Sequence, residues 1–183
     1  DSIYWKNSVT MSWRSSREAT FNFAAVLHAS QIKQFDTTTD YLLFSTPVNV
    51  LWDNRDDPAA PSHGSALFAE IEPFGNLRNQ DRFWRERLRF LQMVRLWPAP
   101  KITLSGEIGC GFIQGLGLMS IPPDERFYAG GSETIRGYAF QKVGPKLNGT
   151  PTGGRSLLTL SAEMAVMVYD PVAVIAFVDG GNV

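Results

Sequence analysis

The chain has 183 residues, with 17 basic and 18 acidic side chains and a formal net charge of −1. This balance argues against a nucleic-acid-binding protein, which would carry a clustered excess of Lys and Arg. No stretch approaches the roughly 20 consecutive apolar residues that a membrane-spanning helix needs, so a helical membrane protein is excluded.

The composition favours a β-rich protein. Charged residues make up 19% of the chain, below the roughly 25% that is usual in soluble domains, while 12% is aromatic. The single cysteine, Cys110, cannot form an intrachain disulfide and offers no metal-binding spacing. The chain starts at Asp1 without a signal peptide and stops at Val183 inside an apolar run, so we interpret it as a fragment.

Alternation of apolar and polar residues predicts eight strands, because successive side chains of a strand point to opposite faces. In chain order they are expected at 3–13, 19–29, 41–52, 65–72, 83–96, 101–112, 155–168 and 172–179. Within 155–168, Leu158, Leu160, Met164 and Val166 share the apolar face, and Thr159, Ser161 and Glu163 share the polar one. We expect the first set to face lipid and the second to face a lumen.

The polar face of the strand at 83–96 carries four cations, Arg85, Arg87, Arg89 and Arg95. Buried charges need water or opposite charges beside them. Such a face fits a wet lumen.

Connector lengths alternate along the chain. Those at 14–18, 97–100 and 169–171 are short, whereas those at 30–40, 73–82 and 114–154 are long. Outer-membrane barrels show this asymmetry, with tight periplasmic turns and long outer loops. A soluble β-sandwich also alternates, but the strand lengths, the nearly uncharged apolar faces and the connectors favour a barrel.

The connector at 53–63 is an exception, since it is long but falls at the end of the strands where the other connectors are short. Asp56, Asp57 and Pro58 predict a compact structured turn there. Asp53, Asp56 and Asp57 could offer oxygen ligands to a cation, yet Asp beside Pro is more often turn chemistry, so no metal site is predicted.

The segment 126–138 reads RFYAGGSETIRGY and is followed by Val143, Gly144 and Pro145. It closely resembles the lumenal-loop signature of the BamA/TamA family of outer-membrane protein assembly factors. Residues 53–58 with Gly64, 153–163 and 177–181 agree with the same family in order and spacing. The Ile-Arg-Gly-Tyr form and the Asp-Asp-Pro turn resemble the TamA branch more than BamA.

This resemblance implies an all-β fold: a C-terminal sixteen-stranded antiparallel transmembrane β-barrel, preceded by periplasmic POTRA domains, with the sixth outer loop folded into the lumen. If 114–154 is that loop, residues 1–183 are a partial barrel domain containing strands six to thirteen. The POTRA domains, the first five strands and the last three would then lie outside this sequence. We expect these eight strands alone not to close into a barrel.

The resemblance also assigns partners to Arg136. The alternation of side chains along each strand puts Glu163 and Asp179 on the lumen side of two neighbouring strands. The family analogy makes them the carboxylates that Arg136 binds. A guanidinium offers a planar fork for bidentate bonding that Lys could not reproduce.

Other motif residues have conformational roles. Gly130, Gly131 and Gly137 permit positive φ and close backbone approach, so they let the loop double back. Ile135 belongs to the same motif. Tyr138 is expected to pack as a rigid aromatic anchor with a hydrogen-bonding tip.

Catalysis is not expected. His28 falls on the polar face of a strand and His63 in a turn, and we interpret both as structural. No Gly-x-Ser-x-Gly elbow occurs, and the run 109–115 has the wrong spacing for a dinucleotide loop and no helix after it. We predict a protein that is not an enzyme and has no catalytic residue, cofactor or metal.

The resulting hypothesis is an integral bacterial outer-membrane protein that inserts other β-barrel proteins or autotransporters. Its expected partners are the outer-membrane bilayer and nascent outer-membrane proteins, which could be joined by an inner-membrane-anchored protein, but not nucleic acid. BamA itself, a two-partner-secretion transporter, a passive porin and a soluble β-sandwich binding module are the alternatives.

Overall fold

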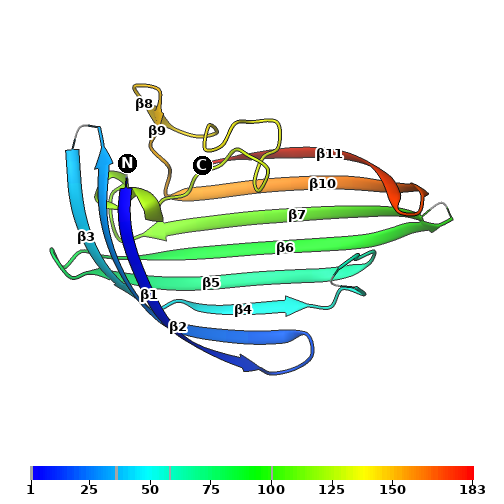
Figure 1. Ribbon diagram of the computed structural model, residues 1–183, viewed down its shortest axis with the longest axis horizontal. Coiled ribbons are helices and arrows are strands. Elements are labelled where there is room, and N and C mark those ends of the chain that lie inside the picture. Colours follow the sequence, from blue (N-terminus) through cyan, green and yellow to red (C-terminus); the bar gives the residue numbers. More distant parts are fainter. Residues whose placement is uncertain (1, 36, 58, 100) are drawn as a thin grey trace.

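A computed structural model of the chain describes residues 2–35, 37–57, 59–99 and 101–183. Nine strands form one curved antiparallel sheet, in the order β1-β2-β3-β5-β6-β7-β10-β11, with β4 pairing β2 and β5 (Figure 1). Their bounds are β1 Ser2–Arg14, β2 Ala19–Gln34, β3 Thr37–Ser45, β4 Val48–Asp53, β5 Gly64–Asn76, β6 Arg82–Pro98, β7 Lys101–Gln114, β10 Ser156–Tyr169 and β11 Val172–Asn182. The all-β, antiparallel prediction is therefore confirmed.

The strand expected at 41–52 is interrupted, because β3 ends at Ser45 and β4 begins at Val48. Pro47 lies in the gap and has no backbone N–H to donate to a neighbouring strand. Its carbonyl still accepts from the amide of Ala24 at 3.0 Å. With β3 and β4 counted as one passage, the described chain crosses the sheet eight times, as predicted.

Two connectors expected to be long are short. β2 and β3 stay paired as far as Gln34 and Thr37, and β5 and β6 are joined by residues 77–81. The reason is that both hairpins continue beyond the residues expected to be strand. The side-chain amide of Gln31 donates to Asp40 at 2.8 Å across β2 and β3, and Phe74 stacks on Phe83 across β5 and β6. The third long connector, 115–155, is long as predicted.

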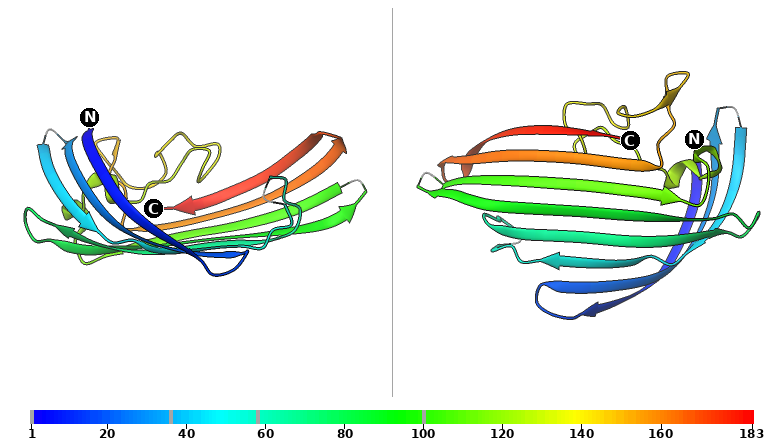
Figure 2. Two further views of the ribbon diagram at one scale, coloured as in Figure 1. Left: turned by 60° about the horizontal axis from the view of Figure 1, so that its bottom comes forward. Right: turned by 180° about the vertical axis from the view of Figure 1, so that it is seen from behind.

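The two faces of the sheet differ in chemistry and exposure. Along β10, outward side chains such as Leu158 (47% exposed), Leu160 (49%) and Met164 (42%) alternate with half-buried Thr159 and Ser161. The long loop lies on the concave side of the sheet (Figure 2), and Ser161 of the second set accepts a hydrogen bond from Arg136 of this loop. The predicted division of faces is thus observed.

The long loop includes two 3-10 turns, η1 Leu118–Ser120 and η2 Pro123–Glu125, and a small hairpin of β8 Lys146–Leu147 and β9 Thr150–Pro151. Neither turn is long and apolar enough to cross a membrane. The start of the loop packs on the concave side through a buried apolar cluster. Its members are Leu43, Phe74, Phe83, Ile113, Ile121 and Phe127.

Arg126 ties the two ends of this loop together. Its guanidinium donates to the carbonyls of Ile121, at 2.9 and 2.7 Å, and of Thr152, at 2.9 Å. Burial lowers the pKa of this guanidinium from its ordinary value. The loop is therefore a folded unit with its own hydrogen bonds.

The sheet is open. β1 and β11 are at its two ends, and each pairs with a single neighbour within the described residues (Figure 1). This agrees with the expectation that these strands do not close into a barrel.

Candidate functional site

Arg136 reaches the wall of the sheet at β10 and β11. Its Nε and Nη2 donate to the two carboxylate oxygens of Asp179, each at 2.8 Å, and its Nη1 donates to Glu163 at 2.8 Å. Nη2 also donates to the hydroxyl of Ser161 at 3.0 Å. The contacts predicted for Arg136 are therefore present, including the bidentate pair with Asp179.

The surroundings of Arg136 favour its charge. The hydrogen bonds to Asp179 and then Glu163 raise the pKa of its guanidinium above the ordinary value. Its Cζ lies 3.6 Å from the centroid of the Phe177 ring, in cation–π contact. The Asp179 side chain is only 3% exposed, against 28% for Arg136, so the carboxylate depends on this guanidinium for compensation.

Two glycines make the reversal of the loop possible. Gly130 has φ of +106°, and a Cβ at that position would lie 2.5 Å from the carbonyl oxygen of Ala139. Gly137 has φ of +85° immediately after Arg136. Such angles are costly for other residues, so these positions explain the glycines in the motif.

The prediction for Tyr138 is wrong. Its side chain is 61% exposed, whereas Ile135 is only 2% exposed. Gly137 adopts a positive φ in a turn, and Tyr138 directly follows it with an exposed side chain. Ile135 is the buried anchor of the motif.

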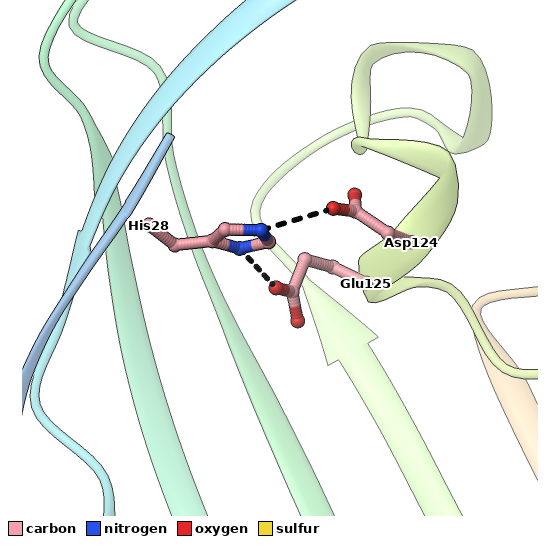
Figure 3. A group of neighbouring side chains, drawn as sticks. All are labelled: His28, Asp124 and Glu125. Atoms are coloured by element: carbon pink, nitrogen blue, oxygen red, sulfur yellow. Dashed lines mark hydrogen bonds and ion pairs between the residues drawn. The ribbon is translucent and has the colours of Figure 1, made fainter. Parts of the chain in front are cut away.

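A second set of contacts joins the start of the loop to β2. His28 Nδ1 lies 3.3 Å from Glu125 Oε1, and His28 Nε2 lies 3.5 Å from Asp124 Oδ2. Figure 3 shows the imidazole between the two carboxylates of η2. The prediction that His28 lies on the polar face is confirmed, but its acidic partners were not foreseen.

This cluster continues across the wall. Arg85 on β6 donates to Glu125 and to Glu72, each at 2.6 Å. Glu72 on β5 also accepts from the hydroxyl of Ser45 on β3 at 2.8 Å. Side chains of four strands and the loop thus form one continuous polar network.

The two carboxylates of η2 differ in their electrostatics. Burial, and next the charge of Glu125, raise the pKa of Asp124. Burial opposes ionisation of Glu125 as well, but the hydrogen bond with His28 and the charge of Arg85 lower its pKa overall.

His28, Asp124 and Glu125 are also the one group of three such side chains, among the described residues, whose ligand atoms lie within 4.8 Å of one another. The two ring nitrogens face different carboxylates, and Arg85 binds the second oxygen of Glu125. The carboxylates of this group therefore already have protein partners, and no metal site is assigned to it.

The four arginines on the polar face of β6 have carboxylate partners, one of the two alternatives, water or carboxylates, that the sequence left open. Besides the Arg85 pairs, the contacts are Arg87–Glu70 at 2.5 Å, Arg89–Glu107 at 2.7 Å and Arg95–Asp56 at 3.5 Å. Opposite charges thus line the concave face in pairs, and its polar character is compatible with water.

The turn between β4 and β5 is compact, as predicted. Asp56 accepts from the amides of Ser62, at 2.8 Å, and His63, at 3.1 Å, and from the Ser62 hydroxyl at 2.5 Å. These bonds, that of the hydroxyl first, hold the pKa of Asp56 well below its usual range. Asp57 accepts from the amide of Ala59 at 2.8 Å, and Pro58 lies outside the described residues.

The sequence held one signal that pointed toward a carboxylate partner such as Glu125. Arg85 falls on the polar parity of its strand and needs a carboxylate, and Asp124 and Glu125 are the acidic residues nearest the start of the 126–138 motif. This requirement did not identify which carboxylate contacts Arg85.

An antiparallel sheet with an apolar exposed face, a polar concave face and a long loop fastened inside is the wall of an outer-membrane β-barrel. The family comparison agrees, because residues 3–183 match the Omp85 superfamily domain. The chain belongs to the Omp85 superfamily, and it is part of an integral outer-membrane β-barrel.

Two curated relatives are similar in sequence. The outer membrane protein assembly factor BamA of Nitratidesulfovibrio vulgaris is 29% identical over 136 residues, covering 70% of this chain and 17% of that protein. A SAM50-like protein of Schizosaccharomyces pombe is 25% identical over 114 residues, covering 61% of this chain and 24% of that protein. The chain therefore spans a quarter or less of these relatives.

A solved structure shares the fold. The crystal structure of BamA from Haemophilus ducreyi lacking POTRA domains 1–3 superposes with a TM-score of 0.86 and 14% sequence identity. The match covers 99% of this chain and 42% of that one. The wall and its internal loop thus have the arrangement of a BamA barrel.

Proposed function

We propose that this chain is the wall and lumenal loop of an assembly factor that inserts other β-barrel proteins into the outer membrane. The observation that carries this proposal is the loop fastened by Arg136 to Asp179 and Glu163 on the inside of an Omp85 wall. The name of the N. vulgaris relative, an outer membrane protein assembly factor, supports the same activity.

The proposed role requires binding and positioning, not bond chemistry. Both histidines contact carboxylates, His28 in the loop network and His63 with Asp56 at 3.1 Å. We therefore propose that the protein is not an enzyme and uses no cofactor. Its partners would be lipid and unfolded client strands, which can add to exposed sheet edges through backbone hydrogen bonds.

Autotransporters as clients, and a TamA-like branch with an inner-membrane-anchored partner, are finer proposals. They rest on the Ile135-Arg136-Gly137-Tyr138 form and on the turn at Asp56, Asp57 and Pro58. Counting the POTRA domains of the full-length protein would separate this branch from BamA and from two-partner-secretion transporters.

The test uses the full-length protein in vesicles of outer-membrane lipids. An unfolded eight-stranded client barrel is added, and its folding is followed by the appearance of a protease-resistant, heat-modifiable form. We expect faster folding than in empty vesicles, and slower folding with Arg136→Ala than with the wild type. Steady ion conductance without any acceleration of client folding would instead identify a porin.

A further inference from the structure

The contacts of His28 favour a charged ring. A neutral imidazole has one N–H and one lone pair, so it can donate to only one carboxylate, whereas an imidazolium donates from both nitrogens. Here Asp124 faces one nitrogen and Glu125 faces the other (Figure 3). A neutral ring would turn a lone pair toward one of two carboxylate oxygens.

The charges around the ring also favour the imidazolium. Three carboxylates, Glu72, Asp124 and Glu125, are balanced by Arg85 and by the ring of His28 when it is protonated. Loss of the imidazolium would leave Arg85 alone with these three groups, two of which have side chains less than 10% exposed. Uncompensated carboxylates in such a place are strongly destabilising.

The other neighbours of His28 do not replace that charge in the network. On β1, Tyr4 packs its ring edge-on at 6.2 Å between centroids, and Lys6 is the cross-strand partner of His28. On β3, the cross-strand partner is the apolar Leu43. The charge of Lys6 acts on both His28 and Glu125. Within the described residues, however, no ion pair is found between Lys6 and the acidic residues of η2, so the imidazolium is the cation that contacts them from β2.

The cluster of His28, Asp124 and Glu125 and the attachment of Arg136 lie at different places along the loop. Asp124 and Glu125 contact β2 and β6 at the start of the loop, whereas Arg136 contacts β10 and β11. The loop therefore has two separate attachments to the wall, and the first includes the buried Ile121 and Phe127.

We propose that His28, Asp124 and Glu125 form a protonation-dependent latch that holds the start of the lumenal loop against the wall. The latch is closed while the imidazole is charged and the carboxylates are ionised. Ion pairing in the docked loop favours the charged ring, so the contribution to docking is complete below about pH 6.5 and is lost as the pH rises. The Arg136 attachment contains no histidine and stays closed.

Amide hydrogen exchange of the full-length protein in lipid nanodiscs tests this proposal. Rates for peptides covering 119–127 are compared between pH 6.0 and pH 8.5 after correction for the intrinsic pH dependence of exchange. Loss of one charge-assisted contact corresponds to about tenfold faster exchange in this segment at the higher pH. Peptides covering 133–137 serve as the internal reference and should change little.

Two variants separate a protonation latch from a merely structural contact. His28→Gln keeps an amide that can donate to a carboxylate but cannot titrate, so exchange at 119–127 should become independent of pH. His63→Gln is the matched control, because His63 is the other histidine of the chain, also faces a carboxylate and is 62% exposed. It should keep the wild-type profile.

Three results would overturn the proposal. They are a wild-type protein without the pH dependence, a His28→Gln variant that retains it, and protection at pH 6.0 that disappears when a metal chelator is added. The last result would identify a metal site in place of a proton latch.

Discussion

The Arg136 attachment predicts a graded response to substitution. Arg136→Ala removes four side-chain hydrogen bonds, two to Asp179, one to Glu163 and one to Ser161. Breaking a buried pair costs about 3–5 kcal/mol, and the 28% exposure of Arg136 places the expected loss near the lower end, about 3 kcal/mol. That loss corresponds to about a hundredfold change in the ratio of docked to undocked loop.

Arg136→Lys keeps the positive charge but not the planar fork. An ammonium cannot bind both oxygens of Asp179 in plane while also reaching Glu163. We expect a loss of about 1–2 kcal/mol, or roughly tenfold, because only part of the charge-assisted bonding is restored.

The assay is amide hydrogen exchange of peptides covering 133–137 in the full-length protein. The backbone amide of Arg136 itself donates to Asp179 at 2.8 Å, so its protection reports directly on docking. Arg155→Ala is the matched control, because Arg155 is exposed and its guanidinium donates to the carbonyl of Leu116 at 3.1 Å, at the base of the loop. Unchanged protection in Arg136→Ala, or equal protection in Arg136→Lys and the wild type, would refute the reasoning.

Three further outcomes follow from the wall and its turns. Leu160→Arg should reduce the heat-modifiable, folded fraction far more than Thr159→Arg, because a lipid-facing Arg costs about 2–4 kcal/mol near the bilayer midplane; equal tolerance would contradict the division of faces. Asp56→Ala should lower the resistance of the β4–β5 turn to protease at pH 7, and the wild-type turn should lose resistance only as the pH falls below about 4, since its carboxylate is stabilised in the ionised form. Gly130→Ala should undock the loop at a cost of about 1–3 kcal/mol, seen as faster exchange at 133–137, because its Cβ would meet the carbonyl oxygen of Ala139 in addition to the strain of a positive φ. Gly149→Ala shares the positive φ (+77°) but its Cβ meets open space in the β8–β9 hairpin, so it should keep the 133–137 segment docked.

The sequence alone determined the features that depend on local alternation. Side chains of a strand change face at every residue, so the apolar set around Leu160 and the inward set around Glu163 follow directly from residue order. The same rule placed four arginines of β6 inward and required water or carboxylates beside them. The signature at 126–138 identified Arg136 as the residue that needs acceptors, because a guanidinium inside a barrel is costly when unpaired.

The ends of the hairpins were harder to predict, because polar residues occur both in loops and in solvated strands. Gln31 and Asp40 were assigned to a connector, yet they pair across β2 and β3. The direction of Tyr138 depended on the backbone angle at Gly137, which composition does not specify.

Only the tertiary structure brought His28 to Glu125, which are 97 residues apart in the chain. Parity put His28 and Arg85 on the concave face, but it could not say how far along the wall the loop descends. That depth is set by the packing of Ile121 and Phe127 against Leu43, Phe74 and Phe83. Residue order fixes which face a side chain occupies, whereas the contact between loop and wall depends on how these buried surfaces fit together in space.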